Sequence, residues 1–134
     1  MNENKVFDDI KKYIEDKNGF IKHNNMHLLK LEDNYAKMYA NVDENSLNPS
    51  GIVHGGLIFG LADSVMGMAA RTSGRNIVTV NSQIDYLKPG KGKKIIAEAK
   101  PIKLGKTLAV FKANIYNDSN ELIATSTGTY YYLD

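Results

Sequence analysis

The chain has 134 residues, of which 43% are hydrophobic, so residues 1–134 are expected to form one domain with a single core. Its 17 basic and 15 acidic side chains give a formal net charge of +2, a balance that provides no indication of nucleic-acid binding. The absence of cysteine excludes disulfides, thiolate nucleophiles and cysteine-based zinc sites, and it favours a cytoplasmic protein.

Residues 1–19 have the pattern of a short helical extension. Apolar side chains from Val6 to Ile14 recur at helical spacing among charged ones, which predicts an amphipathic helix over residues 5–17, ending near Asn18. The polar and acidic start lacks the basic-then-apolar order of a signal peptide, so no export by that route is expected.

Alternating apolar residues from Met26 to Val42 predict two strands of a hairpin, with a turn at residues 32–34. Residues 45–51 are rich in Asn, Ser, Pro and Gly and predict a loop. A long helix is expected to begin near Val53 or His54 and to stop near Gly74.

The rest of the chain predicts four successive antiparallel strands, rich in Val, Ile, Thr and Tyr and separated by Gly, Pro and Asn turns. They span residues 77–87, 94–104, 107–117 and 122–133. Because the long helix is apolar on nearly every side, it must be enclosed. The expected class is therefore α+β, with a curved antiparallel sheet wrapped around a central helix.

Asp63 is the only formally charged side chain between Glu44 and Arg71, and it lies inside the apolar run of residues 57–70. This run is shorter than the roughly 20 residues of a membrane span, so no membrane partner is expected. An ionised carboxylate is costly to bury without a partner. Asp63 is therefore either a structural carboxylate or part of a functional site.

Several other signatures are absent. The chain has no G-x-S-x-G motif, its three histidines fit no metal spacing, and Gly105-Lys106-Thr107 lacks the first glycine of a P-loop. What remains is a set at the loop-to-helix junction, namely Asn48, His54-Gly55-Gly56 and Asp63.

This set fits the stabilisation of an oxyanion. A helix start presents free backbone N–H groups, and Gly55 and Gly56 allow a ligand to approach them. Asn48 offers an amide to a water or a carbonyl oxygen, and Asp63 could act as general base or as nucleophile. Gly55 and Asp63 are about 12 Å apart along a helix, too far to contact one carbonyl. The site is therefore expected to need two antiparallel helices, and so a homodimer.

The chain resembles the hotdog-fold acyl-CoA thioesterases of the phenylacetate-pathway (PaaI-like) type. The resemblance rests on the residues just named together with Leu61-Ala62-Asp63-Ser64, the segment 84–90 and Leu104-Gly105-Lys106. The resemblance covers about residues 26–133. It implies the hotdog fold, a homodimer often paired into a homotetramer, and hydrolysis of an acyl-CoA to free acid and CoA without a metal or cofactor.

The resemblance also implies roles for single residues. Asp63 would be the base or nucleophile, Gly55 the oxyanion donor, Asn48 a positioning residue from the opposite subunit, and His54 an orienting residue. Thr79 matches a small hydroxyl residue near the carboxylate, and it is predicted to share a strand face with Asn81, Gln83 and Asp85. Three further candidates would contact the substrate: Gly56, Lys88 and Lys106.

Other readings stay open. The lysines around Pro89-Gly90 could be a solvated turn, and the two glycines could serve close packing. The rival function is a non-catalytic hotdog module that binds acyl-CoA. Such a module would usually carry a fused DNA-binding segment, which the acidic N-terminal region does not resemble. A hydratase of the same fold would need its own motif, which the sequence lacks. The acyl group is expected to be small, medium-length or aromatic.

Overall fold

The computed structural model describes residues 3–16 and 19–134. Its helices are α1 (Glu3–Asp16), α2 (Phe20–His23) and α3 (Gly55–Arg71), and Glu44–Ser46 form a 3-10 turn, η1. Its strands are β1 (Met26–Glu32), β2 (Tyr35–Asn41), β3 (Ile77–Tyr86), β4 (Lys94–Leu104), β5 (Leu108–Asn117) and β6 (Leu122–Tyr132). Among the helices of these described ranges, none combines the length and apolarity that a membrane crossing requires.

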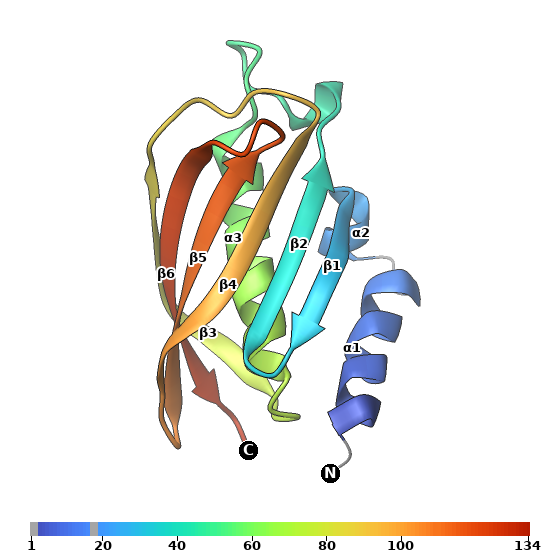
Figure 1. The fold of residues 1–134 in the computed structure, drawn as a ribbon, viewed down its shortest axis with the longest axis vertical. Coiled ribbons are helices and arrows are strands. Elements are labelled where there is room, and N and C mark those ends of the chain that lie inside the picture. The colour runs from blue at the N-terminus through green and yellow to red at the C-terminus, as the bar shows by residue number, and fades with distance from the viewer. Residues whose placement is uncertain (1–2, 17–18) are drawn as a thin grey trace.

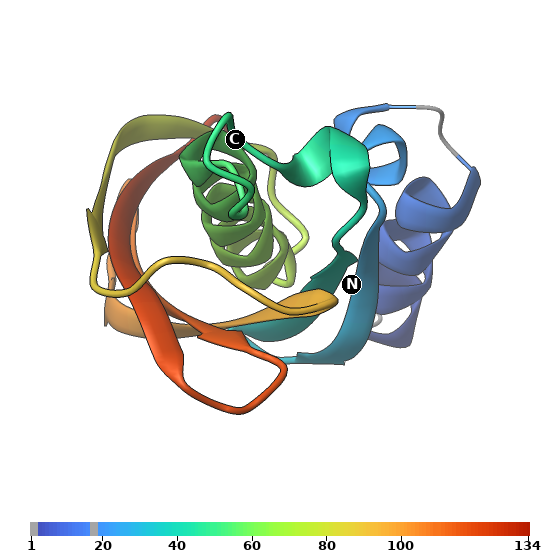
Figure 2. The same ribbon diagram turned by 90° about the horizontal axis from the view of Figure 1, so that it is seen from above.

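The six strands form one sheet in the order β1-β2-β4-β5-β6-β3, and every neighbouring pair is antiparallel. The sheet curls around α3, which runs along its concave side (Figures 1 and 2). The predicted α+β arrangement of a curved sheet around a long helix is confirmed, and the predicted strand limits agree with the observed ones to within one residue.

Small side chains allow α3 to lie close to the sheet. The fully buried alanines of the sheet are spread over four strands: Ala36, Ala40, Ala97, Ala99, Ala109, Ala113 and Ala124. Larger residues fill the remaining space, among them Met38 and Phe111 from the sheet and Leu61 and Met66 from α3. The apolar character of α3 on nearly every side is thereby satisfied by burial.

The helix α1 lies outside this enclosure, beside β1 (Figures 1 and 2). Its buried residues Val6, Ile10 and Ile14 recur every four positions and join the main core. The amphipathic helix was predicted, but its expected end at residues 17–18 lies outside the described residues. The short helix α2 was not predicted, because four residues are too few for a periodic pattern.

Candidate active site

His54 is the N-cap of α3. Its backbone is extended, its N–H donates to the Ser46 carbonyl (2.7 Å), and its ring Nδ1 accepts a hydrogen bond from the Gly56 N–H at 2.8 Å. The histidine therefore satisfies one of the free amides at the helix start. The neighbouring Gly55 N–H donates to no acceptor among the described residues, which leaves it available to a ligand.

Gly55 and Gly56 are held in close contact with their neighbours. A Cβ atom on Gly55 would lie 3.2 Å from the Tyr86 ring, and one on Gly56 would lie 2.9 Å from Nδ1 of His54. The Tyr86 hydroxyl donates to the Gly55 carbonyl at 2.8 Å. Burial raises the pKa of Tyr86, so this hydroxyl remains a donor at neutral pH. Close packing therefore accounts for the absence of a Cβ at both positions.

Asn48 is half-buried in the loop that leads to α3. Its Oδ1 accepts hydrogen bonds from the backbone N–H groups of Ser50 (2.9 Å) and Ile52 (3.3 Å), which fixes the side chain within its own loop. Its Nδ2 makes no hydrogen bond to the residues that the structure describes. Asn48, Gly55 and Gly56 line one cavity of about 410 Å³.

Asp63 lies two turns further along α3 and is half-buried. Its Oδ1 accepts hydrogen bonds from the hydroxyls of Tyr130 (2.9 Å) and Thr79 (3.2 Å). Oδ2 accepts none from the described part of the chain. The three residues line a second cavity of about 570 Å³, bounded by α1, α3 and β3.

The pairing of β3 with β6 brings the two hydroxyls together. Thr79 lies directly opposite Tyr130, so both side chains point toward α3. A bulge at Val80 follows, and Asn81 pairs with Thr129 instead. The prediction that Thr79 shares a face with Asn81, Gln83 and Asp85 is therefore wrong, because the extra residue turns these three side chains to the opposite face.

No motif in the sequence identified Tyr130 as a site residue. The signal that could have identified it is general, since a buried tyrosine usually needs a hydrogen-bond partner for its hydroxyl. The side chain is 1% exposed. Burial raises the pKa of Tyr130, and the negative charge of Asp63 raises it further. The hydroxyl is therefore a donor toward the carboxylate at neutral pH.

The predicted site residues thus fall into two groups within one protomer. Asn48, Gly55 and Gly56 line the first cavity, Asp63 and Thr79 line the second, and the two cavities share no lining residue. This agrees with the separation of about 12 Å expected from the helical rise.

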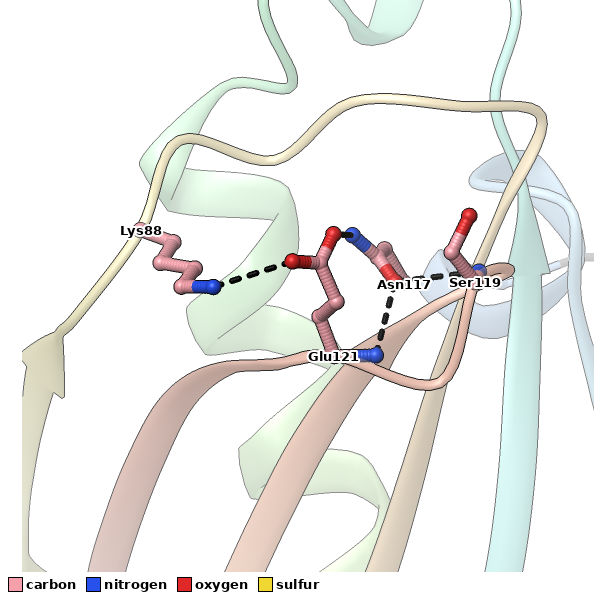
Figure 3. Close-up of polar contacts among 4 residues, drawn as sticks. All are labelled: Lys88, Asn117, Ser119 and Glu121. Carbon is pink, nitrogen blue, oxygen red and sulfur yellow. Dashed lines mark hydrogen bonds and ion pairs between the residues drawn. The ribbon is translucent and has the colours of Figure 1, made fainter.

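The two candidate lysines lie in different surroundings. Lys88 lines the first cavity, and its ammonium group donates to Glu121 Oε2 at 2.9 Å (Figure 3). Glu121 also accepts a hydrogen bond from Asn117, and these two contacts lower its pKa. Lys106 is exposed on the turn between β4 and β5, and its carbonyl accepts a hydrogen bond from Arg75 at 2.9 Å. Arg75 lines the second cavity.

The described residues contain no group of three or more histidine, aspartate or glutamate side chains that could hold a metal ion. The polar groups that line the two cavities are instead two carboxylates, hydroxyls, amides and cations. Such groups can position water, polarise a carbonyl and take up a proton.

A family model described as the thioesterase superfamily matches residues 50–124. A putative esterase of Archaeoglobus fulgidus is 35% identical over 105 residues, covering 78% of this chain and 68% of that protein. Acyl-coenzyme A thioesterase PaaI of Escherichia coli is 28% identical over 102 residues, covering 75% of this chain and 73% of that protein.

Solved structures show the same fold. The structure of Escherichia coli PaaI matches with a TM-score of 0.91 at 23% identity, covering 98% of this chain and 96% of the other. A hypothetical thioesterase of Streptococcus pneumoniae with coenzyme A matches with a TM-score of 0.77 at 29% identity, covering 81% and 85%. The predicted hotdog fold is confirmed by these structures.

Proposed function

The chain belongs to the thioesterase superfamily, in its PaaI-like branch, and from this premise we propose a specific reaction and site. It hydrolyses the thioester of a small, medium-length or aromatic acyl-CoA to free acid and CoA. The reaction takes place at two equivalent sites of a homodimer, each built from both protomers. The homodimers are expected to pair into a homotetramer.

The observation that carries this proposal is the division of the site between two cavities of one protomer. Among the described residues, the cavity at Asp63 is lined by neither Gly55 nor Asn48, and the cavity at Gly55 is lined by no carboxylate. Two copies with antiparallel α3 helices would bring the helix start of one next to Asp63 of the other. Each dimer would then hold two complete sites.

An unpaired sheet edge supports this assembly. β3 is an edge strand, and its Val78 and Val80 side chains are 45% and 58% exposed. Exposed apolar strand edges are sites where a second chain can add. Because β3 also carries Thr79 of the Asp63 cavity, a second copy seated on this edge would lie close to that cavity.

In the proposed site the substrate carbonyl oxygen accepts hydrogen bonds from the Gly55 N–H and the Asn48 amide of the other protomer. These donors stabilise the negative charge that develops on the oxygen when the carbonyl carbon is attacked. His54 fixes the start of α3 in place. Its hydrogen bond with the Gly56 N–H supports this role. The positive end of the α3 dipole adds to this stabilisation.

Asp63 can catalyse the hydrolysis by either of two routes. As general base it takes a proton from water while the water oxygen bonds to the carbonyl carbon, and the intermediate then expels CoA as a thiolate that is protonated. As nucleophile its carboxylate bonds to the carbonyl carbon, CoA leaves, and water then hydrolyses the acyl-aspartyl anhydride. The free Oδ2 of Asp63 suits both routes.

The second cavity fits the acyl group. Its volume of about 570 Å³ lies within the range of small-molecule sites, and it opens onto Asp63. Its apolar walls come from α1, α3 and β3 and include Val6, Ile10, Met68 and Ile77. Lys88 and Lys106 are proposed to contact the phosphates of CoA, and the Streptococcus pneumoniae structure with coenzyme A supports CoA as part of the substrate.

The direct test compares Asp63→Asn and Asp63→Ala with the wild-type protein on a panel of acyl-CoAs, with thiol release as the measurement. We expect a loss of about 10³-fold or more in kcat for both variants. Asp85→Asn is the matched control, because Asp85 is exposed on β3 on the face turned away from α3. Full activity in both Asp63 variants would refute the role of Asp63.

The same panel separates the alternatives. Saturable binding of acyl-CoAs without thiol release by the wild-type protein would identify a binding module. Consumption of an enoyl-CoA with its thioester intact would identify a hydratase.

The shared site has its own test. Asn48→Ala and Asp63→Ala subunits, each inactive alone, are mixed and allowed to exchange. Random pairing makes half of the dimers mixed, each with one intact site, so about a quarter of the wild-type activity should return. If mass spectrometry shows mixed dimers and no activity returns, each site is built within one protomer. Light scattering of the wild-type protein tests the dimer and the homotetramer.

A further inference from the structure

Two hydroxyls meet one oxygen of the proposed catalytic carboxylate, but they are not equivalent. Tyr130 lies 2.9 Å from Asp63 Oδ1, and Thr79 lies 3.2 Å from the same atom. Tyr130 is 1% exposed, whereas Thr79 is exposed. A hydrogen bond to a charged group is stronger when it is short and shielded from water. Tyr130 is therefore the dominant partner.

The tyrosine ring is fixed by its neighbours. It packs edge to face against Phe111, with ring centroids 6.2 Å apart at an interplanar angle of 79°. Gly128 gives the ring its space, because a Cβ atom there would lie 2.9 Å from the ring and 3.1 Å from Met66. The hydroxyl is thus placed by the core rather than by the carboxylate that it contacts.

Burial and the neighbouring charge of Asp63 keep this hydroxyl protonated. Burial raises the pKa of Tyr130, and Asp63 raises it further through its charge and hydrogen bond, while Arg71 has the opposite effect. A hydroxyl that keeps its proton can only donate to an ionised carboxylate. It therefore holds Oδ1 as a donor and takes no proton from the substrate.

We propose that Tyr130 is the positioning residue of Asp63, binding Oδ1 so that Oδ2 is the atom that reacts. The inference rests on the proposed role of Asp63. As a base, Asp63 would receive the proton on Oδ2, and as a nucleophile it would attack through Oδ2. In both cases Tyr130 continues to donate to Oδ1 and never takes up the substrate proton.

A purely structural role would have a different signature. The Tyr130 hydroxyl also lies 3.2 Å from the backbone carbonyl of Asp63, so it could serve only to fix α3 to β6. Loss of such a contact would lower stability. It would leave unchanged the pH dependence of the remaining activity. It would also leave unchanged the kcat of the protein that is still folded.

The test is Tyr130→Phe, which keeps the ring and removes the hydroxyl. The matched control is Tyr132→Phe, since Tyr132 is a buried tyrosine two residues further along the same strand, and its hydroxyl bonds to no described residue. For Tyr130→Phe we expect kcat to fall about 10- to 100-fold with KM changed less than about twofold. The acidic limb of the kcat/KM profile should move to higher pH, because a donor to the charged carboxylate is lost.

Tyr132→Phe should change none of these quantities. Folded Tyr130→Phe protein with unchanged kcat and an unchanged acidic limb would overturn the inference, as would a loss of activity that only follows the folded fraction. Asp63→Asn measured beside it separates the two proposals. If Asp63→Asn is inactive and Tyr130→Phe is fully active, only this inference fails, whereas a fully active Asp63→Asn refutes the proposed function itself.

A second variant covers the case in which Tyr130→Phe does not fold. Site-specific incorporation of 3-fluorotyrosine at position 130 keeps the shape and the hydrogen bond and makes the hydroxyl a stronger donor. The acidic limb should then move to lower pH, opposite to the shift expected for phenylalanine. No shift in an active fluorotyrosine protein would contradict the positioning role.

Discussion

The start and the middle of α3 carry the two halves of the proposed site, and they are built in different ways. At the start, His54 contacts Gly56 and Asn48 contacts Ser50, each only two residues away in sequence. In the middle, Asp63 is contacted by Thr79 and Tyr130, which lie 16 and 67 residues away. The first half therefore depends on local backbone geometry, and the second depends on the register of β3 against β6.

Gly55→Ala should have the largest effect on the local half. The added Cβ would lie 3.2 Å from the Tyr86 ring, which must shift, and it would obstruct the approach of a carbonyl to the Gly55 amide. Loss of one oxyanion donor costs about 10²- to 10³-fold in kcat, so we expect a fall of about 10²-fold, measured by thiol release.

Gly60→Ala is the control for this change. It lies in the same helix, and its Cβ would lie 2.8 Å from the Phe20 ring and 3.6 Å from Met26. The Phe20 ring is exposed and can move aside, unlike the Tyr86 ring that is hydrogen-bonded to Gly55. Because alanine is a better helix former than glycine, this variant should keep its activity and its thermal stability. Equal losses in both variants would show that a general disturbance of α3, and not the Gly55 amide, causes the effect.

The same contrast explains what the sequence could predict. The helix start, the loop around Asn48 and all six strands follow from short-range patterns of glycine, turn residues and alternation, and these predictions are confirmed by the structure. Tyr130 could not be assigned to Asp63, because its place depends on the pairing of two strands about 50 residues apart in sequence. The bulge at Val80 leaves no mark in the sequence, because residues 78–80 are all ordinary β-formers, valine and threonine.

Thr79→Val should have an intermediate effect on the long-range half. Valine keeps the β-branched shape of threonine and removes only the hydroxyl that lies 3.2 Å from Asp63 Oδ1. Because Tyr130 still holds that oxygen, we expect kcat to fall about 3- to 10-fold, less than for Tyr130→Phe. Thr129→Val is the matched control, since Thr129 lies on the opposite face of β6. A larger loss for Thr79→Val than for Tyr130→Phe would reverse the order of the two partners.

Glu121→Gln should have the smallest effect, and it tests whether the first cavity extends to the phosphates of CoA. Glutamine can still accept the hydrogen bond from Asn117, but it no longer pairs as an anion with Lys88. The side chains of this ion pair are 56% and 50% exposed, so the pair is weak and a phosphate can compete for the lysine.

Freed from its partner, Lys88 should bind that phosphate more readily, so we expect KM for acyl-CoA to fall about twofold with kcat unchanged. An acyl-pantetheine substrate is the control, because it carries the thioester without the nucleotide phosphates, and its KM should not change. Lys88→Met should raise KM for acyl-CoA alone. If neither variant alters KM, the lysines around Pro89-Gly90 are a solvated turn, and the phosphate contact must be sought at Lys106 beside the other cavity.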